Sequence, residues 1–332
     1  MKKIIFIIVS ILLISVLAIS FVACGNKDKD LSGDLTGQTI KVAAPEGTPA
    51  LAICHMVTEN TTLYGATMEY KAVAPALIAA ELAGGNSDIV IMPINAGAKK
   101  IIDGANYKLV SIAVDGSLYM IGKKDVAGTI TMEDIKGKKI ASIGQGAVPG
   151  LTLEYVLKQN GITIIYEGEP AANQVLIQYV ADGPAARQAL QNNSVSFAVV
   201  GEPAATSFKN VAALGLNSEM DIQAEYGKIA NVTTYPQAGL FVRASLASNT
   251  EFMNKLFEAL AASKTWVTSN KSEVTSYMQT NLYSTANFPA IAIDRCAINA
   301  KALTEADKTA IISFLDRIMP AVQWENNKDN IF

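Results

Sequence analysis

Short apolar runs that alternate with helical segments constrain the fold of this chain more than any other feature. The first part holds four such runs, and helical segments with Gly or Pro at their ends separate them. The apolar runs are 40–44, 68–74, 88–92 and 109–121, and the predicted helices are 48–64, 75–84 and 95–103. An order of this kind implies a parallel sheet with right-handed crossovers. The sequence therefore predicts an α/β fold of mainly parallel sheets flanked by helices.

A second unit with the same alternation begins near Thr131. Thr131 to Asp134 has the pattern of a helix-starting capping box, in which side chains bond to the free backbone N–H groups. The predicted strands are 139–143, 162–166 and 196–200, and the predicted helices are 151–160 and 183–192. Segment 171–181 gives no clear prediction. A second α/β lobe is expected here.

The last part of the chain is mainly helical. After one more strand at 238–242, Phe252, Leu256 and Leu260 recur at helical spacing, and a second capping box begins at Thr304. An α/β unit, a second α/β unit and then one strand with helices suggest that the chain crosses out and returns. The expected boundaries are 39–116 plus 240–332 for lobe 1 and 120–235 for lobe 2. The crossings are expected near 117–123 and 235–239.

The N-terminus predicts export from the cytoplasm. Lys2 and Lys3 precede an apolar run from residue 4 to 23, which is typical of a secretory signal peptide over 1–23. Residues 21–24, which end in Cys24, resemble a bacterial lipobox, in which the cysteine carries the lipid. An uncleaved membrane anchor stays open, because about 20 apolar residues can span a bilayer. Residues 24–38 are polar and are expected to form a flexible tether.

Composition excludes some partners and ligands. The formal net charge is −3 and no basic stripe occurs, so no nucleic-acid partner is expected. Cys54 and Cys296 lie among apolar neighbours, which favours free buried thiols, although an exported protein could pair them. His55 is the single histidine, so a metal site built on several histidines is excluded. A packed or surface role is expected for it, and neither a metal nor a cofactor is predicted.

Several stretches resemble one known family. The lipobox, the polar tether, the Gly-Thr-Pro turn at 47–49, DIVIMPINAG at 88–97 and ITMEDIKGKKIASIGQG at 130–146 carry the resemblance. They are similar to the periplasmic-type substrate-binding lipoproteins of ABC importers, over roughly residues 39–270. Within that family the nitrate, sulfonate, taurine and thiamine-precursor branch is most similar.

The resemblance implies two α/β lobes that close on a small molecule in a cleft. It also implies a lipid anchor on Cys24 at the extracytoplasmic face of the membrane. An ABC transporter permease is the implied partner. The protein itself is expected to be a monomer and not an enzyme.

The ends of the predicted strands supply the candidate ligand-binding residues. In open parallel sheets, ligands bind beyond the carboxyl ends of the strands, where helix N-termini present free N–H groups. The candidates are Glu46, Gly47, Thr48, Pro93, Asn95, Ala96, Asp115, Ser117, Gln145, Gly146, Ala147, Glu202, Tyr235 and Gln237.

The charges at these strand ends suggest a class of ligand. Glu46, Asp115 and Glu202 lie there without a basic residue, and Arg187 and Arg243 are the nearest candidates. Three carboxylates favour a neutral or amine-bearing heterocycle, such as a pyrimidine precursor of thiamine. A sulfonate, nitrate or taurine ligand is the alternative, because helix N-termini can bind anions unaided. The acids could instead be solvated or cap helices.

Two other classes of protein compete with this interpretation. Gly144, Gly146 and Gly150 follow a strand, and Glu167 ends the next one, which resembles a dinucleotide-binding fingerprint. The third glycine is one place late, and nicotinamide cofactors are not expected outside the membrane. P-loop, nucleophile-elbow and zinc-protease motifs are absent. A structural or adhesive lipoprotein is disfavoured because repeats and low-complexity segments are missing.

Overall fold

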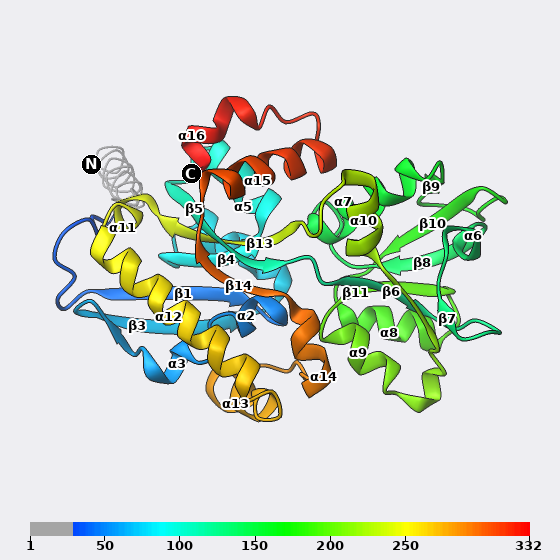
Figure 1. The fold of residues 1–332 in the computed structure, drawn as a ribbon, viewed down its shortest axis with the longest axis horizontal. Coiled ribbons are helices and arrows are strands. Elements are labelled where there is room, and N and C mark those ends of the chain that lie inside the picture. The colour runs from blue at the N-terminus through cyan, green and yellow to red at the C-terminus, as the bar shows by residue number, and fades with distance from the viewer. Residues whose placement is uncertain (1–28) are drawn as a thin grey trace, which may run out of the picture.

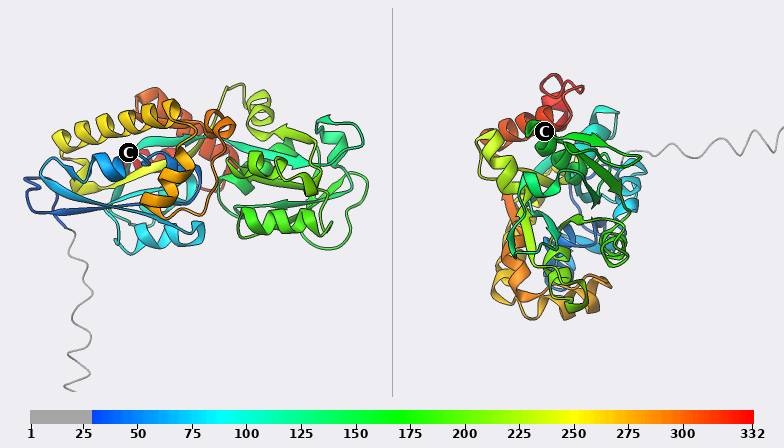
Figure 2. Two further views of the ribbon diagram at one scale, coloured as in Figure 1. Left: turned by 90° about the horizontal axis from the view of Figure 1, so that it is seen from below. Right: turned by 90° about the vertical axis from the view of Figure 1, so that its right-hand side faces the viewer.

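Two seven-stranded sheets, each flanked by helices, lie end to end along the long axis of the molecule (Figures 1 and 2). The computed structural model describes residues 29–332, so the predicted signal peptide and Cys24 lie outside the described residues. We call the part built on the first sheet lobe 1 and the part built on the second sheet lobe 2. The predicted α/β fold with two lobes is confirmed.

The sheet of lobe 1 combines parallel and antiparallel pairs. In spatial order its strands are β14 (Ile298–Ala302), β5 (Tyr107–Asp115), β13 (Pro236–Arg243), β4 (Ile89–Pro93), β1 (Thr39–Pro45), β3 (Ala66–Val73) and β2 (Thr62–Leu63). Only β1 pairs in parallel, with β3 and β4. Strand β13 returns from lobe 2 and inserts antiparallel between β4 and β5. The expectation of a mainly parallel sheet is therefore wrong for lobe 1.

The sheet of lobe 2 is mainly parallel. In spatial order its strands are β7 (Gly128–Thr129), β12 (Ser218–Asp221), β6 (Leu118–Gly122), β11 (Phe197–Gly201), β8 (Lys138–Ser142), β10 (Gln174–Tyr179) and β9 (Thr163–Ile165). Strand β6 is antiparallel to both β11 and β12, because it continues the chain directly from lobe 1. Strand β10 lies within segment 171–181, which carried no clear prediction.

The helices of lobe 1 come from both ends of the described chain. They are α2 (Thr48–Leu51), α3 (Met56–Glu59), η1 (Pro75–Leu77), α4 (Ile78–Ala83), α5 (Ile94–Ile102), α11 (Ala244–Ala247), α12 (Thr250–Ser269), α13 (Val274–Leu282), α14 (Ala290–Ile293), η3 (Asp294–Cys296), α15 (Glu305–Ile318), η4 (Glu325–Asn327) and α16 (Lys328–Ile331). The predicted helix 48–64 is broken into α2 and α3. Its end instead forms a hairpin between β2 and β3, because Tyr64 and Gly65 both take positive φ, as a two-residue turn requires.

The helices of lobe 2 follow the prediction more closely. They are α6 (Met132–Ile135), α7 (Val148–Gln159), α8 (Gly183–Gln191), α9 (Ala204–Lys209), η2 (Ala212–Leu214) and α10 (Ile222–Ala230). Both predicted capping boxes are confirmed. Thr131 caps α6 by accepting from the N–H of Asp134, and Thr304 caps α15 in the same way from Asp307.

The segment before β1 packs on lobe 1. Leu31 and Leu35 are fully buried in its core. Asn249 Nδ2 also donates a hydrogen bond to the carbonyl of Gly33 over 2.8 Å. The prediction of a flexible tether is therefore wrong for residues 29–38. Two leucines four residues apart supply enough apolar area to fix an otherwise polar segment.

Asn249 joins this segment to the start of α12, and its replacement should have a measurable effect on stability. Its Oδ1 accepts from the N–H of Phe252 and caps the helix. We expect Asn249→Ala to lower the free energy of unfolding by about 0.5–2 kcal/mol in urea titrations. Asn249→Ser is the control, since its hydroxyl keeps the cap without adding a charge and loses the bond to Gly33. Equal losses in the two variants would contradict a capping role.

One hydrophobic cluster runs through both lobes. Helix α15 begins next to β14 in lobe 1 and packs against α7 of lobe 2 (Figure 1). Phe314 on this helix stacks on Tyr235, with ring centroids 5.2 Å apart, and meets the ring of Tyr226 edge-on. The lobes are therefore connected by two strand crossings and by the packing of α15.

Candidate ligand site at the junction of the lobes

The two strand crossings lie side by side between the lobes. The N–H of Gly116 donates to the carbonyl of Tyr235 over 2.9 Å, and the N–H of Ser117 donates to Gln237 Oε1 over 3.2 Å. A Cβ on Gly116 would lie 2.6 Å from Gln223 Oε1 and 2.7 Å from the ring of Tyr235. Glycine is thus required for this close approach of side chains to backbone.

Strand ends of lobe 1 touch lobe 2 directly. Thr48 Oγ1 donates to the carbonyl of Glu202 over 2.7 Å, and Asn95 Nδ2 donates to the carbonyl of Gly146 over 3.0 Å. Gly47 precedes Thr48 with φ of 95°, a conformation that side chains other than hydrogen rarely allow. We call the region around Thr48, Asn95, Ser117, Glu202 and Tyr235 the interlobe junction.

The carboxylate of Glu202 is completely buried at this junction. It accepts hydrogen bonds from the N–H of Thr206 over 3.1 Å and from Thr206 Oγ1 over 2.9 Å, in the first turn of α9. Arg295 Nε lies 2.7 Å from Glu202 Oε1. Burial raises the pKa of Glu202, while Thr206 and Arg295 act in the opposite direction.

Arg295 reaches from η3 of lobe 1 into an acidic and aromatic part of lobe 2. Its Nη2 lies 3.2 Å from Glu219 Oε2, and its guanidinium carbon lies 3.9 Å from the centroid of the Tyr119 ring. Lys209 Nζ also lies 2.9 Å from Glu219 Oε2. Although burial opposes it, Lys209 and Arg295 lower the pKa of Glu219. We call these five residues (Glu202, Glu219, Arg295, Lys209 and Tyr119) the Arg295 network.

The sequence led us to expect no basic residue at the site. That expectation is wrong, because Arg295 lies beside Glu202. The two candidates that the sequence offered have other roles. Arg243 is buried at the far end of β13 and pairs with Asp88, and Arg187 is exposed with its guanidinium over Phe208. Arg295 lies far from Glu202 along the chain, in a segment for which no strand end was predicted.

The other two acids at the strand ends have separate partners. Glu46 Oε2 accepts from Thr285 Oγ1 over 2.6 Å, and Asp115 Oδ2 accepts from Asn299 Nδ2 over 3.2 Å. Burial raises the pKa of Asp115. Each predicted acid is thus bonded to a different neighbour, and the acids do not form a group of unpaired carboxylates.

Several polar atoms at the junction are buried without a hydrogen-bond partner among the described residues. Ser117, Asn95 and Tyr235 are only 1–2% exposed, yet Ser117 Oγ, Asn95 Oδ1 and the Tyr235 hydroxyl bond to nothing there. Gln223 Oε1 and Thr234 Oγ1 share this condition. Burial also raises the pKa of Tyr235. An unsatisfied buried group costs about 1–3 kcal/mol, so each of these atoms calls for a partner from outside the described residues, such as a water or a ligand.

The remaining predicted residues contribute backbone and shape. Pro93 ends β4, and Ala96 lies in the first turn of α5. Ala147 precedes α7, and Gln145 is exposed next to Gly146. Sequence reasoning missed Arg295, Glu219, Tyr119 and Gln223, which meet the junction only through the tertiary fold.

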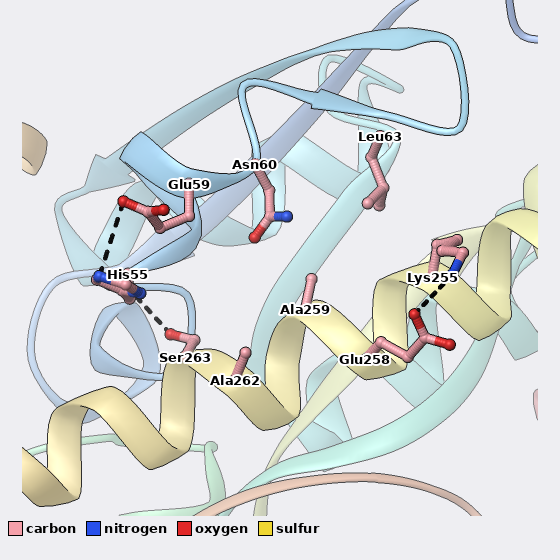
Figure 3. A pocket seen from close by; sticks show the side chains of 9 residues that line it. All are labelled: His55, Glu59, Asn60, Leu63, Lys255, Glu258, Ala259, Ala262 and Ser263. Carbon is pink, nitrogen blue, oxygen red and sulfur yellow. Dashed lines mark hydrogen bonds and ion pairs between the residues drawn. The ribbon is translucent and has the colours of Figure 1, made fainter.

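Two surface hollows lie on lobe 1, away from the interlobe junction. One, of about 450 Å³, lies between α3 and α12 and is drawn in Figure 3. His55 at its edge stacks on Trp266 with ring centroids 4.5 Å apart, so the packed role expected for this histidine is confirmed. The other, of about 460 Å³, lies between α12 and the C-terminus.

Cys54 and Cys296 are both buried and free, as expected, and burial raises the pKa of each thiol to about 12. Within residues 29–332, no cluster of three or more His, Cys, Asp or Glu side chains could hold a metal ion. No helix in the same part of the chain is long and apolar enough to cross a bilayer.

Comparisons with solved structures give the fold a known context. An ABC transporter protein from Parabacteroides distasonis is 19% identical with a TM-score of 0.68, over 87% of this chain and 94% of that one. The aliphatic sulphonate binding protein SsuA from Escherichia coli is 14% identical with a TM-score of 0.62, over 88% and 94%. A Candida albicans protein described as having the generic periplasmic binding protein fold is 14% identical with a TM-score of 0.58, over 89% and 96%.

In sequence, no family model and no curated protein matches the chain. The structural neighbours include ligand-binding components of ABC transporters, and they share the arrangement of two α/β lobes described above. The chain therefore has the periplasmic-binding-protein fold.

Proposed function

We propose that this protein is the solute-binding component of an ABC importer, and not an enzyme. The observation that carries the proposal is the cluster of buried, unpartnered polar atoms at the interlobe junction. Two of these residues, Asn95 and Ser117, closely follow the ends of β4 and β5, and strand ends are where α/β sheets bind ligands. The ABC-transporter proteins among the structural neighbours support the same function.

The proposed mechanism is closure of two lobes around a solute. The lobes, predicted as 39–116 plus 240–332 and 120–235, would rotate about the links between β5 and β6 (116–117) and between α10 and β13 (231–235), where few residues must absorb the rotation. A thermal-shift panel of pyrimidines, pyridines and alkanesulfonates tests binding, and X-ray scattering tests compaction. A solute that raises the melting temperature without changing the radius of gyration would contradict the closure mechanism.

Two classes of ligand compete for the site. A donor-bearing heterocycle, such as a pyrimidine related to thiamine precursors, fits the acceptor atoms Asn95 Oδ1 and Gln223 Oε1. An aliphatic sulfonate is the second candidate, because SsuA from Escherichia coli is among the structural neighbours. We favour the heterocycle, since carboxylates and acceptor oxygens are a poor electrostatic match for an anion.

We further propose that the protein is a monomer held at the extracytoplasmic face of the membrane by a lipid on Cys24. We expect Cys24→Ser to release protein into the medium or to leave the precursor uncleaved, because the thiol that carries the lipid is gone. Fractionation and labelling with a radioactive fatty acid measure this. Cys54→Ser is the matched control and should stay membrane-bound, since Cys54 is buried inside lobe 1. Labelled, membrane-bound Cys24→Ser protein would exclude the lipobox.

A further inference from the structure

We infer that the ligand of the interlobe junction is an uncharged molecule with hydrogen-bond donors. Arg295 lies beside Glu202, where the positive group of a cationic ligand would otherwise bind. This inference rests on the proposed function and narrows it. Three observations carry it: the charge balance of the Arg295 network, the orientation of the acceptor atoms, and the burial of hydroxyl groups that lack partners.

The Arg295 network is electrically balanced before any ligand arrives. It holds the two carboxylates of Glu202 and Glu219 and the two cations of Arg295 and Lys209. The carboxylate of Glu202, which the sequence offered as a partner for an amine, lies 2.7 Å from Arg295 Nε. A ligand amine beside it would face the guanidinium of Arg295. An anion would face two carboxylates whose cations are already engaged, so either charge would be poorly compensated.

The amide side chains at the junction are turned so that they accept. Asn95 uses its Nδ2 on the carbonyl of Gly146 over 3.0 Å, which leaves Oδ1 as the buried free atom. Gln223 likewise directs Nε2 at the carbonyl of Thr233 over 3.4 Å and leaves Oε1. Carbonyl-type oxygens in buried positions select ligand N–H or O–H groups and disfavour anionic oxygens.

Variants that lack the hydroxyls of Ser117 or Tyr235 distinguish a ligand-binding role from a purely structural one. Neither hydroxyl has a partner among the described residues, so its removal costs no hydrogen bond within the protein. Tyr235→Phe keeps the ring that stacks on Phe314. We expect Tyr235→Phe and Ser117→Ala to keep or raise the melting temperature, and to weaken ligand binding about tenfold each.

The experiment compares probes that share a scaffold and differ in charge. The pyrimidine series is uracil, 5-aminomethyluracil and 5-carboxyuracil. The pyridine series is nicotinamide, 3-aminomethylpyridine and nicotinate, and the alkane series is ethanesulfonamide, ethylamine and ethanesulfonate. Calorimetry and thermal shifts at pH 7.5 give their affinities for the wild-type protein and for Arg295→Gln and Arg295→Lys.

The expected result is that the neutral member of a binding series is preferred over both charged members by tenfold or more. Arg295→Gln should shift this preference towards the amine about tenfold, because Glu202 then lacks its cation. Arg295→Lys should keep the wild-type order, since the positive charge is retained. If Arg295→Gln does not fold, the order of affinities within each series for the wild-type protein still tests the inference.

The outcomes separate the inference from the proposed function. Preference for a sulfonate, carboxylate or amine by the wild-type protein would overturn the inference and leave a solute-binding function intact. Loss of stability in Tyr235→Phe without loss of binding would also overturn it. Failure of every series to bind would count against both.

Discussion

Replacing Arg243 with methionine should lower the free energy of unfolding by about 3–5 kcal/mol, because buried Asp88 then keeps only the half-exposed Lys29, whose Nζ lies 4.0 Å from its Oδ2. The two side chains are 6% and 7% exposed, and Arg243 Nε donates to Asp88 Oδ1 over 3.0 Å. Asp88 Oδ2 also accepts from the N–H of Lys41 over 3.0 Å, and Arg243 Nη2 donates to the carbonyl of Gly85. The pair joins β13 to the strands β1 and β4 at the edge opposite the interlobe junction.

Urea titrations followed by circular dichroism measure this effect. The double variant Asp88→Asn with Arg243→Met should recover part of the loss, since it leaves no uncompensated charge. Lys255→Met is the surface control, because Lys255 and Glu258 form an exposed pair and such pairs contribute about 0–1 kcal/mol. A single Arg243→Met variant as stable as the Lys255→Met control would show that the buried pair does not hold the sheet.

The sequence predicted the local features of the fold well, because their causes are local. The capping boxes at Thr131 and Thr304 depend only on residues within one helical turn. Strands β12 and β14 were missed, since Ser218 to Asp221 and Ile298 to Ala302 carry no run of apolar residues long enough to mark them. Their strand form comes from pairing with β6 and β5.

Part of the candidate site was also predictable, because strand ends can be recognised from the local sequence. Of the predicted candidates, Thr48, Asn95 and Glu202 take part in hydrogen bonds between the lobes, and Ser117 and Tyr235 lie in the two strand crossings. Their assignment to a ligand stays a prediction. Arg295 could not be found in this way, because it reaches Glu202 from the short η3 helix after α14. The inference of a ligand class from the charges at the strand ends was therefore made without Arg295, the cation beside Glu202.

Replacing Phe314 with alanine should destabilise the protein by about 3–5 kcal/mol and should also loosen the two lobes. Phe314 is 1% exposed and contacts the rings of Tyr235 and Tyr226, while α15 begins in lobe 1 and packs on α7 of lobe 2. On the same helix, Arg317 Nη1 donates to the Tyr226 hydroxyl over 3.3 Å. The cavity left by the ring would therefore lie on the side of the strand crossings where α15 restrains their rotation.

The matched control is Phe252→Ala. Phe252 is fully buried on α12. It belongs to a separate hydrophobic cluster that is formed by residues of lobe 1 alone. Its loss should reduce stability by a similar amount without altering how the lobes are held together. Scattering should show a larger radius of gyration for ligand-free Phe314→Ala than for Phe252→Ala and the wild type. Equal radii in all three would show that the two crossings alone set the separation of the lobes. A larger radius for Phe314→Ala alone would show that the packing of α15 on lobe 2 limits how far the lobes separate to admit a solute.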